Sequence, residues 1–402
     1  MFIFIYLFLT GIANKYYFQI YGNEGINFLG IINLMLILTL YFKVWSYLHV
    51  KKEFLNKKLI YPVILFSVAL LLITPFSIDI PTTIRGLNRI LSAMAFYLIT
   101  YFMIVKNQRG EEGLFRFLFI IFIVLSVYGV IEYTTRFNFI KGDSTAYSIT
   151  MGSSKVVASF NRIRTTFMHP SIYAFSILTF LPLSIYYLKK YKKNVYVCGF
   201  VLLLINVILT YTRIAWIAVA VQLTISLFLF KSKRVWSMCL LLIPICIILS
   251  GQIMNRLFID SSVEGRSQLV LFGLNIFKTY PLFGSGLGTY LILSTPYFGE
   301  ELATHCDYIR MFAETGIIGG ISYLILLYSI VAFTMKNLKK NDFAKISFLT
   351  MIGFLIFSLT DNGLAYSHIF WAMIGLYNGL ITRDNYHVYC ITSKKAVIGR
   401  MI

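Results

Sequence analysis

Residues 195–230 read VYVCGFVLLLINVILTYTRIAWIAVAVQLTISLFLF, and the basic clusters KKYKK (189–193) and KSKR (231–234) enclose them. The apolar residues on either side of Thr210–Arg213 form two runs, each long enough for a helix across most of the ~30 Å hydrocarbon core of a bilayer. Because clusters of lysine and arginine stay on the cytoplasmic side, we expect the turn at Arg213 to face outwards. The stretch therefore predicts a membrane hairpin with one charge at its tip.

The same pattern recurs along the whole chain of 402 residues, which is 58% hydrophobic and only 13% charged. Soluble domains carry about 25% charged residues, so this composition is typical of a bilayer protein. We predict an all-α, polytopic integral membrane protein with about 12 transmembrane helices, or about 11 if the short first run does not cross. The predicted spans cover 2–13, 26–42, 60–76, 86–105, 114–133, 170–188, 195–211, 213–230, 235–250, 307–335, 344–361 and 364–381.

The basic clusters fall in alternate gaps between these runs, which predicts that both termini lie in the cytoplasm. This distribution accounts for the formal net charge of +20 and argues against nucleic acid as a partner. No stretch is left for a soluble domain, so we expect a single membrane domain over 1–402. Met1–Ala13 has no basic n-region and no small-residue cleavage site, so we interpret it as a first span rather than a cleaved signal. The five cysteines show no spacing typical of a disulfide framework.

Two of the predicted outer gaps are long, 134–169 and 251–306. Binding and catalytic residues often lie on ordered loops that a rigid scaffold holds. In the second loop, the apolar pattern over 265–280 predicts an amphipathic helix in the membrane interface, which Pro281 ends. The glycine-rich segment 284–288 is not followed by the Lys-Ser/Thr pair of a phosphate loop. We expect a flexible loop with close backbone packing there.

Arginine is unevenly distributed between the two predicted sides. The cytoplasmic gaps hold 18 Lys and 5 Arg, whereas the outer side holds 4 Lys and 9 Arg. A guanidinium group suits bidentate hydrogen bonding to phosphate or carboxylate, so the arginines on the outer side predict an anionic ligand. Interfacial arginines also anchor to lipid headgroups or pair with acidic residues, and this alternative stays open for each of them. The nine are Arg85, Arg89, Arg136, Arg162, Arg164, Arg213, Arg256, Arg266 and Arg310.

Arg213 and His305 are the strongest individual candidates. A charge at the tip of an apolar hairpin faces protein or water rather than lipid, which marks Arg213 as a functional candidate. His305 stands just before an amphipathic stretch that contains Arg310 and Glu314. A neutral imidazole at an outer membrane surface can take a proton from a sugar hydroxyl, so His305 is a candidate base.

Other histidine patterns have simpler explanations. His305, Cys306 and Asp307 are adjacent in the chain, so their side chains are poorly placed to converge on one metal ion, and we predict no metal site. His169 precedes Pro170, a proline suited to the first position of a helix. We therefore expect His169 to have a structural role.

Three blocks of this sequence resemble the O-antigen ligase and polymerase superfamily. They are LTYTRIAW (209–216), the Gly265–Arg266 helix that runs to YPLFGSGLGTY (280–290), and the block from His305 to Gly320, and their order and spacing agree with the family. The resemblance covers 160–330, and the layout with one large outer loop resembles membrane glycosyltransferases of the GT-C type. Thr212 stands where the family often has serine, and Cys306 stands where it often has asparagine.

The resemblance implies metal-independent, inverting glycosyl transfer without a cofactor, in the bacterial cytoplasmic membrane, with the active site facing the periplasm or the exterior. The implied donor is an undecaprenyl-diphosphate-linked glycan. Arginines can stabilise a leaving diphosphate, and this role carries over to Arg213 and Arg266. The role of the base carries over to His305. The weaker candidates for substrate contacts are Arg162, Arg164, Arg310, Asp307 and Glu314.

Three activities fit this resemblance and the basic outer surface. The first is a polymerase that joins lipid-linked repeat units of an O-antigen, capsule or exopolysaccharide. The second is a ligase that transfers the finished glycan to lipid A core. The third, a flippase or transporter of lipid-linked glycans, predicts charges that are accessible from both sides, whereas here they gather on one side. The expected partners are the lipid-linked glycan and membrane lipid, with a chain-length regulator or a lipid A core acceptor as a third.

Overall fold

The computed structural model describes residues 56–106, 111–140, 143–144, 146–151, 154–167, 169–191, 193–233, 236–237, 262–364 and 368–398. The predicted spans 2–13 and 26–42 lie outside these residues, as do nearly all of 235–250 and residues 251–261 of the large loop, including Arg256.

Each predicted span that lies within the described residues coincides with a helix. Six helical segments there are long and apolar enough to cross a membrane: α3 with the short 3-10 helix η2, α4, α5, α6, α8 and α14. This confirms the all-α, polytopic membrane class, while the total number of spans stays a prediction. The helices of the bundle are α3 (Lys57–Ile73), η2 (Thr74–Phe76), α4 (Ile80–Lys106), α5 (Glu111–Thr135), α6 (Pro170–Lys190), α7 (Asn194–Leu209), α8 (Arg213–Phe230), α14 (Asp307–Asn337), α15 (Asp342–Phe357) and α16 (His368–Ile398).

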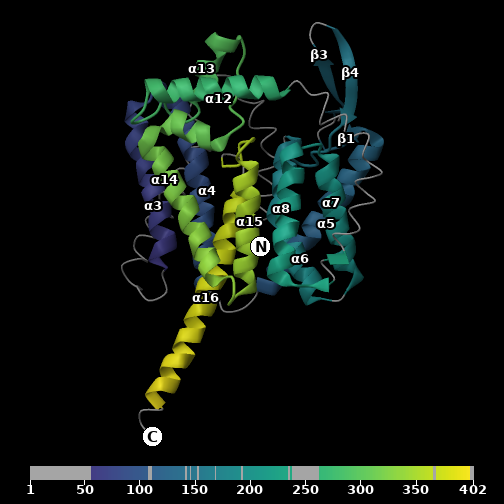
Figure 1. Ribbon diagram of the computed structural model, residues 1–402, viewed down its shortest axis with the longest axis vertical. Helices are drawn as coiled ribbons and strands as arrows, with labels where there is room; N and C mark the ends of the chain where they lie inside the picture. Colours follow the sequence, from purple (N-terminus) through teal and green to yellow (C-terminus); the bar gives the residue numbers. More distant parts are fainter. Residues whose placement is uncertain are drawn as a thin grey trace.

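The bundle consists of two groups of helices (Figure 1). One group contains α3, α4, α14, α15 and α16, and the other contains α5, α6, α7 and α8. Helix α15 packs against both α6 and α8 and so joins the groups. Gln222 on α8 is fully buried at this junction, where its Nε2 donates to the carbonyls of Leu178 (3.1 Å) and Leu349 (2.9 Å). Nearby, the buried rings of Phe354 and Phe370 stack with centroids 4.5 Å apart.

One end of the bundle carries α12 (Ser262–Thr279), which lies across it, and α13 (Thr289–Phe298) (Figure 1). Leu269 and Ile276 of α12 are buried, whereas Gln268 and Lys278 are exposed. This confirms the amphipathic helix predicted over 265–280. We refer to this end as the α12 end, and the sequence predicts that it faces outwards.

Two β-hairpins precede α6, and the sequence interpretation did not foresee them. Strand β1 (Phe137–Asn138) pairs with β2 (Asp143–Ser144), and β3 (Ala146–Met151) pairs with β4 (Ser154–Asn161), both antiparallel. The β3–β4 hairpin projects from the bundle at the α12 end (Figure 1). The signal that was missed is the alternation of apolar and polar residues in AYSITM (146–151), which is typical of a strand.

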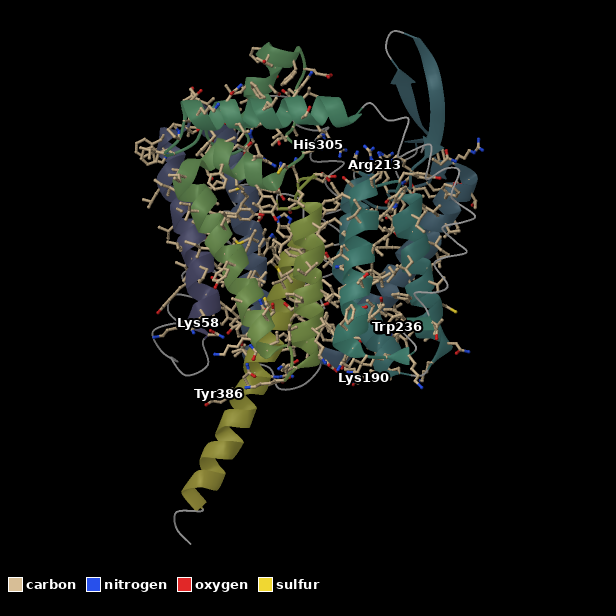
Figure 2. The ribbon with its side chains drawn as sticks, in the orientation of Figure 1. Lys58, Lys190, Arg213, Trp236, His305 and Tyr386 are labelled. Carbon is tan, nitrogen blue, oxygen red and sulfur yellow. The ribbon has the colours of Figure 1, made fainter. Side chains whose placement is uncertain are left out.

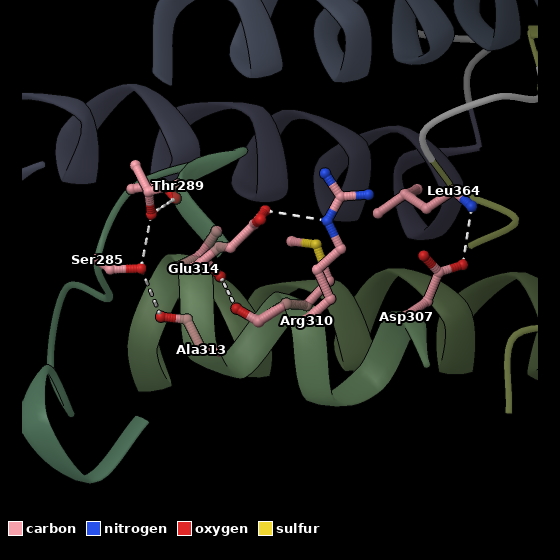
Figure 3. A network of polar contacts seen from close by, with 10 residues as sticks. Ser285, Thr289, Asp307, Arg310, Ala313, Glu314 and Leu364 are labelled. Carbon is pink, nitrogen blue, oxygen red and sulfur yellow. Dashed lines mark hydrogen bonds and ion pairs between the residues drawn. The ribbon is translucent and has the colours of Figure 1, made fainter. Parts of the chain in front are cut away.

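The span predicted over 307–335 is a helix broken at Gly316, whose backbone is non-helical (φ 62°, ψ −164°). The glycine-rich loop docks against this break (Figure 3). The N–H groups of Ser285 and Gly286 donate to the carbonyls of Ala313 (3.1 Å) and Glu314 (2.9 Å), and the Ser285 hydroxyl also donates to the carbonyl of Ala313 (3.3 Å). The N–H of Ile317 donates to the carbonyl of Pro281 (2.8 Å). The loop thus supplies partners for the interrupted helix, which confirms the predicted close backbone packing, and these bonds hold it in one conformation.

Candidate active site

His305 and Arg213 lie at the α12 end, beneath α12, where the two helix groups meet (Figure 2). His305 is partly buried in the loop just before α14, and Arg213 is the partly buried first residue of α8. The structure therefore places these two residues, predicted to be catalytic and far apart in the chain, at the same end of the bundle.

Two charged side chains act on the imidazole of His305. Burial lowers the pKa of His305 from its ordinary value of 6.5, Asp361 raises it, and Arg266 lowers it further. Arg266 extends from α12, and Asp361 lies in the turn between α15 and α16. Because their charges act on the same imidazole, we group His305, Arg266 and Asp361 as one cluster. The net effect favours a neutral imidazole.

Sequence reasoning did not single out Asp361. The available signal was its place, since it is the acidic residue that ends the apolar run 344–361 on the predicted outer side. Its carboxylate Oδ1 accepts a hydrogen bond from the N–H of Asn362 (2.8 Å). That it lies near His305 depends on the packing of α15 against α14, which no local pattern reveals.

His169 caps α6, which agrees with the structural role expected for it, and it also interacts with His305. Its Nδ1 accepts from the N–H of Ser171 (3.3 Å) at the start of the helix. Burial lowers the pKa of His169 to about 4, and the charges of Arg162, His305 and Arg164 act in the same direction, while Asp361 opposes them. His169 therefore stays neutral at physiological pH.

A short loop with Arg162 and Arg164, here called the arginine loop (162–165), lies beside the start of α8. The Nε of Arg162 donates to the carbonyl of Thr210 (2.9 Å), and its Nη2 lies 3.4 Å from Thr212 Oγ1. The N–H of Ile163 donates to the carbonyl of Leu209 (3.3 Å). These bonds join the arginine loop to the turn that carries Arg213.

The helices add positive potential to the same region. Helices α6, α8 and α14 all begin at the α12 end, at Pro170, Arg213 and Asp307. The N-terminus of a helix carries a partial positive charge and outward-pointing N–H groups, which favour anions. Together with the arginines, they make this region suited to a phosphate-bearing ligand.

Arg310, Glu314 and Asp307 have clear partners within the protein (Figure 3). Arg310 Nε donates to Glu314 Oε2 (3.1 Å), and these side chains are 14% and 1% exposed. Asp307 Oδ2 accepts from the N–H of Leu364 (2.8 Å) and from Ser358 Oγ (3.0 Å). Asp307 thereby ties the start of α14 to the turn that carries Asp361. Substrate contacts by these three residues stay a prediction.

Comparison with protein families decides the assignment of this region. Residues 198–324 match the model of a family described as O-antigen ligase. This segment is similar to the O-antigen ligase family. It contains Arg213, Arg266 and His305 together with α8, α12 and α13, which confirms the resemblance seen in the sequence. Comparison with curated proteins finds no match.

The match with this family indicates a function of the O-antigen ligase or polymerase type, whose members are glycosyltransferase-like enzymes. Asp361 and His169 lie outside the matched segment, yet both interact electrostatically with its His305. The arginine loop, also outside the segment, acts on His169. The wider core of 160–330 stays a prediction.

Proposed function

We propose that this protein is a polysaccharide polymerase, which joins undecaprenyl-diphosphate-linked repeat units on the outer face of the cytoplasmic membrane. The observation that carries the proposal is the cluster of a neutral His305 with Arg266 and Asp361, within and beside the segment that matches the O-antigen ligase family. A base and an anion-stabilising cation are the two groups that this transfer needs from the protein.

In the proposed reaction, His305 accepts the proton of the attacking sugar hydroxyl. The hydroxyl oxygen forms a bond to the anomeric carbon of the donor as the bond between that carbon and the diphosphate oxygen breaks. The electron pair leaves with the diphosphate, and the configuration of the anomeric carbon is inverted. Arg213 and Arg266 stabilise the negative charge that develops on the leaving diphosphate.

Asp361 and Arg266 have opposite effects on the pKa of His305, and each effect supports a different stage of the proposed reaction. Burial keeps His305 unprotonated before the reaction, and the charge of Arg266 adds to this. Once the imidazole has taken the proton, the carboxylate of Asp361 stabilises the resulting cation. A base whose pKa lies near the working pH combines both requirements.

The proposal is tested by His305→Ala and Arg266→Ala in purified protein supplied with lipid-linked repeat units. We expect each variant to lose at least about 100-fold in kcat/KM, because a positioned base or charge contributes about that much. Lys278→Ala is the matched control, since Lys278 is an exposed cation on the same helix α12 as Arg266. Full activity of both variants, with normal membrane insertion, would show that the assignment is wrong.

The matched family is described as O-antigen ligase, which favours a ligase as the second candidate. The two activities differ in the acceptor. Lipid-linked repeat units alone are expected to give a ladder of products if the protein is a polymerase. If products form only when lipid A core is added, the protein is a ligase. In cells, loss of a polymerase leaves single repeat units on the core, whereas loss of a ligase leaves the core bare.

A further inference from the structure

Glu132 is a fully buried carboxylate near the end of α5, and the proposed reaction does not use it. Its Oε2 accepts from the N–H of Thr165 (2.8 Å), and its Oε1 accepts from the N–H of Arg164 (3.2 Å) and from Asn138 Nδ2 (2.9 Å). A buried carboxylate is costly unless such donors surround it. Here the donors include two consecutive N–H groups of the arginine loop.

Asn138 and Tyr128 complete this arrangement. Asn138 is fully buried, and its Nδ2 also donates to the carbonyl of Thr165 (2.8 Å). Tyr128 OH donates to Asn138 Oδ1 (3.1 Å). We call Tyr128, Glu132 and Asn138 the acidic cradle. It binds Thr165 through both its N–H and its carbonyl, so the backbone of the arginine loop is held at a defined place.

The backbone that the acidic cradle holds is strained. Thr165 has a φ of 50°, in the left-handed region that β-branched residues rarely adopt. Such a conformation persists only where the surroundings impose it. The hydrogen bonds of Thr165 with Glu132, which accepts from its N–H, and with Asn138, which donates to its carbonyl, provide that constraint. The resulting turn directs the chain from Arg162 and Arg164 towards His169.

The arginine loop in turn acts on the active site. Arg162 and Arg164 both lower the pKa of His169, which interacts electrostatically with His305. On its other side the loop is bonded to Thr210 and Leu209, next to Arg213. The acidic cradle therefore fixes one side of the positively charged region, while α12 with Arg266 forms another.

We propose that Glu132 is a positioning residue, which presents Arg162 and Arg164 to the diphosphate of the lipid-linked donor. This inference rests on the proposed function. Glu132 does not touch substrate, and it acts through the backbone of the arginine loop. An amide in its place would put an N–H group opposite the N–H of Arg164 or Thr165, so Glu132→Gln removes an acceptor while preserving the size of the side chain.

The test compares Glu132→Gln, Asn138→Ala and the control Gln222→Leu in purified, full-length protein. Gln222 is equally buried and joins helices, but its partners Leu178 and Leu349 lie outside the site. The measured quantities are kcat and KM for the lipid-linked donor, the thermal unfolding midpoint, and hydrogen exchange of the amides in 160–167.

For Glu132→Gln we expect faster exchange at Arg164 and Thr165 and a rise in KM of about tenfold, as for the loss of a hydrogen bond to a charged group. We expect kcat to change by less than about threefold, because the base and Arg266 are intact. Asn138→Ala should produce the same pattern more weakly, and it serves as the test if Glu132→Gln fails to fold. Gln222→Leu should lower the unfolding midpoint and leave KM unchanged.

An unchanged KM together with faster exchange would overturn the inference, since Glu132 would then only brace the fold. A rise in KM of the same size in Gln222→Leu would overturn it as well. Failure of the proposed function has a different signature, because His305→Ala would then retain activity whatever the exchange data show.

Discussion

The imidazole of His305 shows how single charges set the chemistry of the site. Burial and the charge of Arg266 lower its pKa, and Asp361 raises it. His169, a second neutral imidazole, interacts with His305 but is committed to capping α6. His305 has no such capping role, and charges from α12 and from the turn between α15 and α16 set its protonation state.

The pH dependence of activity follows from this balance. A base must be unprotonated, so kcat/KM should fall as the pH falls through the pKa of His305, which lies below 6.5. Asp361→Asn removes the influence that raises the pKa, so the acidic limb of the profile should move to lower pH. Glu301 is an exposed acidic residue in the loop that carries His305, and Glu301→Gln should leave the acidic limb of the pH profile unchanged. A shift to higher pH in Asp361→Asn would contradict the assigned roles.

At the scale of elements, the glycine-rich loop and the broken helix α14 form one unit. The N–H of Ile78 donates to the carbonyl of Ser285 (3.0 Å), so the segment before α4 also joins this junction. The loop follows directly on α12, which carries Arg266, and α14 follows directly on His305. The junction therefore fixes the base relative to the cation.

Two glycines with similar backbone angles should respond very differently to substitution. A Cβ at Gly284 (φ 75°) would lie 2.3 Å from the carbonyl carbon of Glu314, whereas a Cβ at Gly299 (φ 78°) has no described atom within 4 Å. We expect Gly299→Ala to lower the free energy of unfolding by about 1 kcal/mol, because alanine is strained in the left-handed conformation. Gly284→Ala should lower it by about 2–3 kcal/mol more, because its Cβ would also overlap the backbone of Glu314. Thermal unfolding midpoints in detergent measure both, and equal shifts would argue against the close docking.

At the scale of the whole molecule, the two ends of the bundle differ in their basic residues. Arginines of the site lie at the α12 end, and a group of lysines lies at the opposite end, where Lys189 and Lys345 pair with Asp342 at 2.9 Å and 2.7 Å. The first of these pairs joins α6 to α15. Helix α16 extends beyond the bundle from the lysine end (Figure 1).

This asymmetry predicts the orientation in the membrane. In a protein without its native cysteines, Tyr297→Cys on α13 should react with an impermeant thiol reagent in intact cells, because this position is 69% exposed at the α12 end. Lys190→Cys, at the other end of the bundle, should react only after the membrane is permeabilised. The opposite labelling pattern would place the site in the cytoplasm, where the proposed substrate is not polymerised.

The sequence by itself determined the helices and put forward the candidate residues of the site. Hydropathy and charge along the chain are local quantities, and the bilayer converts them directly into spans such as 170–188 and 213–230. Arginines and a histidine in the predicted outer loops already indicated His305, Arg266 and Arg213. Only the tertiary structure decided how these parts meet. Asp361 approaches His305 and Glu132 holds Thr165 because helices distant in the chain pack together, and such contacts leave no periodic signal in either segment. The hydrogen bonds that join the glycine-rich loop to α14 are equally non-local, since each needs its partner already in place.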